Sequence, residues 1–161
     1  MTREERTVRD ELSSLAADDQ GRRLLQFALR GVQESGRGLT YGCWVKRDGG
    51  VSGCLFQHAY WQGVAEGAFT RAGKQATQIR EYVGDEDFAL VMGGIRAFDA
   101  LAKRRFKRWS RSGPLGLPLR TLDEERWRAA VESILIDVLA GGVREPGGPP
   151  REPRLSARTS S

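Results

Sequence analysis

Apolar residues recur at helical spacing along most of the chain. Near its start Val8, Leu12 and Leu15 share one face of a predicted helix, with charged and small polar residues between them. A second apolar stripe begins at Leu24, after an interruption around Gly21, so the pattern leaves open whether this region is two helices or one kinked helix. The predicted helical segments are residues 8–15, 20–35, 68–83, 85–109 and 121–141.

The clearest of these helices starts at Asp85, which has two further acids behind it in the first turn, where negative charge complements the helix dipole. Thr121 and Glu124 have the spacing of a capping box and predict the start of the last helix, which Gly141 ends. The apolar stripe of the clearest helix runs over about six turns. It consists of Phe88, Val91, Met92, Ile95, Phe98, Ala102, Phe106 and Trp109.

Between the second and third helical segments the pattern changes to aromatic and β-branched residues. Two such runs flank Asp48-Gly49, which is a strong signal for a type I′ β-hairpin turn. In that register the numbers of paired residues sum to 97 and Cys43 lies opposite Cys54, although Gly50 also permits a shifted turn. Residues 55–67 are compatible with either strand or helix; their glycines weaken a helix, so we expect a strand to about Tyr60.

These patterns predict an α+β fold, in which a mostly helical single domain of four to five helices, residues 1–142, surrounds a central β-hairpin. Residues 143–161 are rich in proline, glycine, arginine and serine and are predicted to be a disordered C-terminal tail. No apolar run approaches the ~20 residues that a membrane-spanning helix needs. The charged start has no apolar segment of the secretory type, so a cytoplasmic location and no membrane partner are expected.

Positive charge is concentrated in one segment. The chain has a net charge of +5, and residues 103–111 alone carry six cations and no acid. Such a segment predicts a located patch that contacts the phosphates of nucleic acid. The alternative is a solvated helix end whose cations complement the helix dipole. The candidate nucleic-acid-binding residues are Lys103, Arg104, Arg105, Lys107, Arg108 and Arg111.

A helix-turn-helix built around Gly84 is not a good interpretation of this charge. Its second helix would begin with the acids of residues 85–87, and these would face the DNA groove and repel it. Phe106 and Trp109 lie on the predicted core stripe, so they are not expected to stack on unpaired bases.

Thiol and imidazole chemistry is limited to Cys43, Cys54 and His58, because the chain has two cysteines and one histidine. On a strand Cys54 and His58 would be ~13 Å apart, too far for a shared metal ion, whereas on a helix they would share a face. The preferred interpretation is two buried thiols and a partly buried histidine, with a metal or redox sensor as the minor alternative. The chain has none of the common phosphate-loop, nucleophile-elbow or zinc-protease motifs.

The sequence therefore predicts a non-enzymatic binding or regulatory module without a cofactor, for which nucleic acid is the most specific macromolecular partner. The alternative is a protein-interaction or oligomerising subunit that uses the edge of the hairpin, with Trp44 and Trp61 as contact residues. A metal or redox sensor at the cysteines and the histidine ranks third.

Overall fold

The computed structural model describes residues 1–41, 52–106 and 121–141, and within the last range the side chains from Glu124 onwards. These residues form a mostly helical fold with six helices and two short strands. The helices are α1 (Arg3–Leu15), α2 (Asp19–Glu34), α3 (Leu55–Ala65), α4 (Gln75–Val83), α5 (Asp85–Arg105) and α7 (Thr121–Gly141), and the strands are β1 (Gly38–Leu39) and β2 (Ser52–Gly53).

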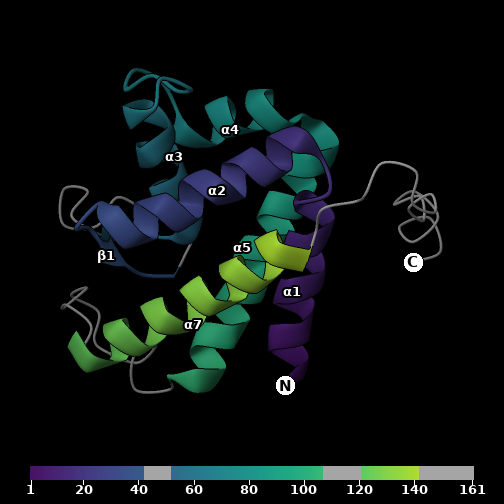
Figure 1. Cartoon of the computed structure of the whole chain (residues 1–161), viewed down its shortest axis with the longest axis vertical. Coiled ribbons are helices and arrows are strands. Elements are labelled where there is room, and N and C mark those ends of the chain that lie inside the picture. Colours follow the sequence, from purple (N-terminus) through teal and green to yellow (C-terminus); the bar gives the residue numbers. More distant parts are fainter. Residues whose placement is uncertain (42–51, 107–120, 142–161) are drawn as a thin grey trace.

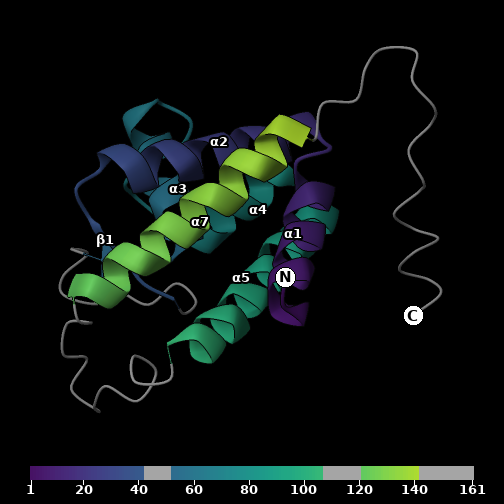
Figure 2. The same ribbon diagram turned by 60° about the horizontal axis from the view of Figure 1, so that its bottom comes forward.

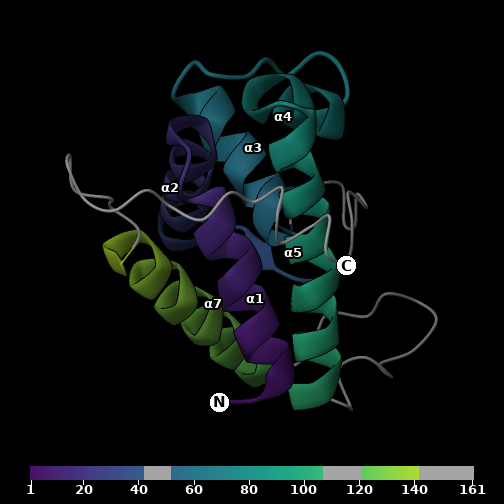
Figure 3. The same ribbon diagram turned by 90° about the vertical axis from the view of Figure 1, so that its right-hand side faces the viewer.

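Two helix pairs dominate the packing. α1 lies along α5, and α2 lies along α3. α7 crosses both helix pairs and contacts α2, α1 and β1 (Figures 1 and 2). α1 and α5 run in opposite directions, so the first turn of α1 lies beside the last turn of α5 (Figure 3).

One hydrophobic core joins all of these helices, and the predicted apolar stripes supply most of it. Val8, Leu12 and Leu15 of α1 are completely buried, as predicted. Trp127 of α7 packs its ring edge-to-face against Phe98 of α5. Other buried residues from the predicted helical segments include Leu24, Leu25, Ala28, Val32, Ile79, Val91, Ile95, Ala102, Val131, Ile134, Leu135 and Val138.

The expected strand to about Tyr60 is wrong, because this segment forms α3. Seven of the eleven residues of α3 are buried, so the helix has no polar face and shows no helical period in the sequence. The Gln57 side chain accepts a hydrogen bond from the Cys54 backbone N–H at 2.9 Å, which satisfies a donor at the start of the helix. Gly63, which argued against a helix, is needed there because a Cβ would lie 2.3 Å from the Phe69 ring.

The predicted antiparallel hairpin is also wrong. β1 and β2 are two residues long and pair in parallel, with Gly38 opposite Ser52 and Leu39 opposite Gly53. A parallel pair needs a crossover connection rather than a two-residue turn. The predicted turn at Asp48-Gly49, together with Cys43 and Trp44, lies outside the described residues.

Two smaller corrections concern the helix count and the helix ends. The structure separates α1 from α2, and it begins α4 at Gln75 rather than near residue 68. Gly84, at a φ of 90°, separates α4 from α5 as predicted. The predicted tail lies outside the described residues, as do Lys107, Arg108, Trp109 and Arg111. Within the described part of the chain, no helix is long and apolar enough to cross a membrane.

Candidate functional site

The described half of the predicted basic cluster lies at the end of α5. Lys103, Arg104 and Arg105 form its last turn, and all three are exposed. Lys103 makes no ion pair with another described residue. The structure therefore presents these cations on the surface, at the end of the helix where positive charge is favourable.

The two arginines are paired with acids from the opposite end of the sequence. Arg105 Nη2 lies 3.0 Å from Glu5 Oε1, and Arg104 Nε lies 3.6 Å from Glu4 Oε2. The side chains of both arginines remain accessible, at 58% for Arg104 and 37% for Arg105, so these are surface ion pairs. Such pairs contribute only about 0.2–1 kcal/mol each to stability.

The same end of the molecule gains two cations that the sequence pattern did not assign to it. Arg3 and Arg6 are exposed and flank Glu4 and Glu5 in the first turn of α1. The last turn of α5 and the first turn of α1 together carry five cations and two carboxylates, a net charge of +3. We call these two neighbouring helix turns the basic end; its cations are Arg3, Arg6, Lys103, Arg104 and Arg105.

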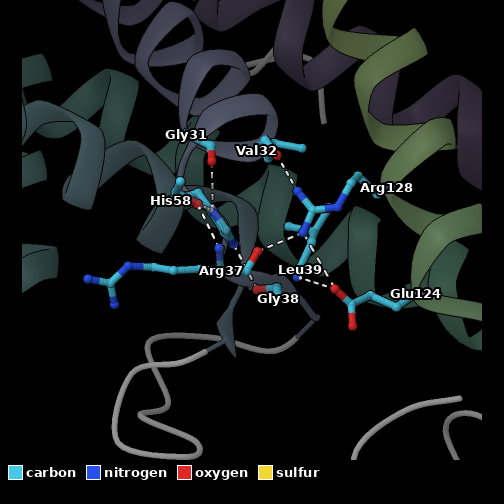
Figure 4. Close-up of polar contacts among 9 residues, drawn as sticks. Gly31, Val32, Arg37, Gly38, Leu39, His58, Glu124 and Arg128 are labelled. Atoms are coloured by element: carbon cyan, nitrogen blue, oxygen red, sulfur yellow. Dashed lines mark hydrogen bonds and ion pairs between the residues drawn. The ribbon is translucent and has the colours of Figure 1, made fainter. Parts of the chain in front are cut away.

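A second polar cluster surrounds His58, which is completely buried. His58 Nε2 lies 2.9 Å from the Gly38 carbonyl oxygen (Figure 4). His58 Nδ1 lies 3.3 Å from Ser35 Oγ. A neutral ring satisfies both contacts, because Nε2–H donates to Gly38 while Nδ1 accepts the Ser35 hydroxyl proton. The Gly31 carbonyl oxygen, also 3.3 Å from Nδ1, accepts the Ser35 backbone N–H at 3.1 Å.

Arg128 of α7 completes this cluster from the other side. Its guanidinium donates hydrogen bonds to the carbonyl oxygens of Val32 and Arg37, the latter at 2.6 Å, and pairs with Glu124 at 3.4 Å (Figure 4). Glu124 Oε1 also accepts the Leu39 backbone N–H at 3.3 Å. The acid of the predicted capping box thus ties α7 to β1.

The cluster acts as a connector between α2, α3, β1 and α7. Carbonyl groups at the C-terminal end of a helix lack partners within the helix. In this protein the side chains of His58 and Arg128 lie against such carbonyl groups, in the last turn of α2 and in the segment that follows it. The guanidinium of Arg37 lies 4.2 Å from the centroid of the Trp61 ring, a cation–π contact. Trp61, predicted as an interface residue, is therefore partly covered by its own chain.

Burial lowers the pKa of His58 below its ordinary value of 6.5, because the low-dielectric interior disfavours a charged ring. Hydrogen bonding to the carbonyl oxygens of Gly38 and Gly31 raises the pKa of His58 and so offsets part of this effect. The positive charges of Arg128 and Arg37 lower the pKa further. The folded protein thus holds His58 neutral near pH 7.

This pKa predicts that the protein loses stability as the pH falls below about 6.5. The unfolded chain takes up a proton on His58 there and the folded protein resists it, so the free energy of unfolding decreases by up to about 1.4 kcal/mol per pH unit, until the pH reaches the lower folded pKa. Urea unfolding between about pH 7.5 and 5.5 measures this, because most carboxyl groups titrate at lower pH.

His58 is the only histidine of the chain. In a protein expressed without a histidine tag, a pH dependence of stability in this window can therefore be assigned to His58. His58→Gln should remove the pH dependence in this window. A stability that is flat in the wild type, or that rises with acid, would contradict the burial of a neutral ring.

Cys54 and His58 face different surroundings although they are four residues apart. His58 faces α2 and β1, whereas Cys54 lines a small apolar cavity together with Phe98 of α5 and Trp127 of α7. That cavity measures about 10 Å³, room for roughly one water molecule. Among the described residues, no three His, Cys, Asp or Glu side chains are placed to hold a metal ion.

A larger, open groove of about 450 Å³ lies between α2 and the segment that joins α3 to α4. One wall is an ion pair, with Arg30 Nε 2.8 Å and Nη2 2.9 Å from the two Glu66 oxygens. The hydrogen bond from Arg30 lowers the pKa of Glu66, so this carboxylate is charged at neutral pH. The two charged groups of this ion pair neutralise each other, and Arg23 adds an exposed cation to the lining of the groove.

No protein-family model matches the chain, and no curated protein or solved structure is significantly similar to it.

Proposed function

We propose that this protein is a non-enzymatic binding module that contacts a polyanion, most specifically nucleic acid, through the basic end. The observation that carries the proposal is that the first turn of α1 lies beside the last turn of α5, and that these two turns together carry five exposed cations and a net charge of +3. Phosphate groups attract such a surface because each contact releases counterions from the nucleic acid.

The exposure of the cations supports binding more than it supports a purely structural role. A helix end needs only partial positive charge to complement its dipole, an effect of about 0.3–1 kcal/mol. Arg3 and Arg6 lie at the start of α1, where positive charge is unfavourable for the helix, so the dipole does not explain them. Lys107 and Arg108 follow Arg105 in the sequence after one intervening residue, Phe106.

Among the described residues the alternative of an oligomerising hairpin edge has less support, because β1 and β2 are parallel and two residues long. A metal or redox sensor has no supporting geometry among the described residues, since both ring nitrogens of His58 face groups of its own chain.

The test is a salt titration of binding to duplex DNA of mixed sequence, followed by fluorescence anisotropy. The variant Lys103→Gln, Arg104→Gln, Arg105→Gln should bind more weakly, and its log–log salt slope should be shallower by roughly 0.9 for each phosphate that the protein no longer neutralises. Circular dichroism should show an unchanged helical content, because substitutions at exposed positions usually cost under about 0.5 kcal/mol.

The matched control removes three exposed cations elsewhere, with Arg23→Gln, Arg71→Gln and Lys74→Gln. It changes the net charge equally and should leave the salt slope close to that of the wild type. If the wild type shows no salt-sensitive binding at low ionic strength, or if the control weakens binding as much as the test variant does, the basic end is not a nucleic-acid site.

A further inference from the structure

The basic end contains its own competitor for phosphate. Glu4 and Glu5 present carboxylate oxygens to Arg104 and Arg105 at 3.6 and 3.0 Å. A guanidinium binds carboxylate and phosphate oxygens with the same donor geometry, so the two compete for its N–H groups. We infer that the first turn of α1 regulates the proposed site by holding these two arginines in internal ion pairs; this inference rests on the proposed function.

The competing acids are fixed in place. Val8 and Leu12 of α1 are completely buried, which anchors the helix against the core. The first turn is capped, since Thr2 Oγ1 accepts the Glu5 backbone N–H at 3.2 Å. Glu4 and Glu5 therefore stay next to the end of α5 when the arginines change partners.

The exposures also fit competition. The Glu5 side chain is 15% exposed and that of Glu4 is 26%, less than either of the arginines they pair with. The arginines thus lie outside the acids, where a phosphate can reach them from solvent. Glu4 Oε2 is itself buried and accepts no hydrogen bond from a described residue, so at 3.6 Å Arg104 is held by an ion pair alone, without a hydrogen bond.

Neutralising the acids should therefore tighten binding. Glu4→Gln with Glu5→Gln should raise the affinity for duplex DNA by roughly 2- to 25-fold, the combined strength of two exposed ion pairs. The salt slope should become steeper by up to about 0.9 for each arginine released.

The charge-matched control is Glu81→Gln with Glu86→Gln. Both acids are exposed, and Glu86 lies in the first turn of α5, so this control also removes an acid from the start of a helix. It should raise affinity only by the general effect of net charge. Circular dichroism of both double variants checks that the helices remain.

A second comparison isolates the ion pairs. In a background with Arg104→Gln and Arg105→Gln, the Glu4 and Glu5 changes have no pairs to release and should raise affinity no more than the control does. Equal effects in both backgrounds would overturn the inference. Weaker binding of the Glu4, Glu5 variant would also overturn it, because the acids would then be positioning the arginines for phosphate.

These results separate the two levels of the proposal. If the wild type binds and the acids have no specific effect, only the competition fails. If neither the wild type nor any variant binds with salt sensitivity, the proposed function fails and the inference fails with it.

Discussion

Gly31→Ala is expected to destabilise the protein by about 2 kcal/mol or more, although alanine is the better helix former. A Cβ at Gly31 would lie 2.6 Å from the His58 carbonyl oxygen and 3.1 Å from its carbon. These are backbone atoms of α3, which cannot rotate away, so α2 and α3 must separate. Thermal unfolding should show a midpoint lower by about 4–8 °C.

Gly93→Ala is the matched control, since this glycine also lies in the middle of a helix. The atoms nearest to its added Cβ belong to the carboxylate of Glu11, 2.9 Å away, at the end of a flexible side chain. Because Glu11 can move away, Gly93→Ala should raise the free energy of unfolding by up to about 1 kcal/mol, through the higher helix propensity of alanine. If both variants lose the same stability, close packing of α2 against α3 is not the cause.

Arg128→Met should cost about 2–3 kcal/mol in the free energy of unfolding. The change removes charge-assisted hydrogen bonds to the Val32 and Arg37 carbonyl oxygens, each worth about 1.5–3 kcal/mol when well shielded. About a quarter of the Arg128 side chain is exposed, so solvent reduces the total. Urea unfolding measures the loss, and Arg126→Met, on the exposed side of α7, should cost under about 0.5 kcal/mol.

A double-mutant cycle with Glu124 tests whether the two side chains act together. Without Arg128 the Glu124 carboxylate keeps the Leu39 N–H but is left without its cation. Adding Glu124→Gln to Arg128→Met should therefore recover about 1 kcal/mol. Additive losses would show that the arginine and the acid contribute independently.

The helices that could be predicted from the sequence are those with one buried and one exposed face. Val8, Leu12 and Leu15 repeat at helical spacing because α1 contacts the core on one side only. α3 could not be predicted in this way, because nearly every side chain in its first two turns is buried and the period disappears. Its aromatic and apolar composition then resembles that of a strand.

The candidate sites were predictable only in part, for a related reason. The cations of residues 103–105 are consecutive, so the sequence shows them directly. Arg3 and Arg6 join them through the packing of α1 on α5, and no local pattern tells which helix ends will meet. The contact between Glu124 and Leu39 was missed because the acid also fits a local capping box.

The packing of α1 on α5 has a consequence for synthesis of the chain. The apolar face of α1 leaves the ribosome before its partner α5, which is complete only at Arg105. At ~5–20 residues per second, the roughly 90 residues in between take about 5–18 s. During that time Val8, Leu12 and Leu15 lack the cover that α5 provides, so α1 is a binding site for a chaperone that recognises short apolar helices.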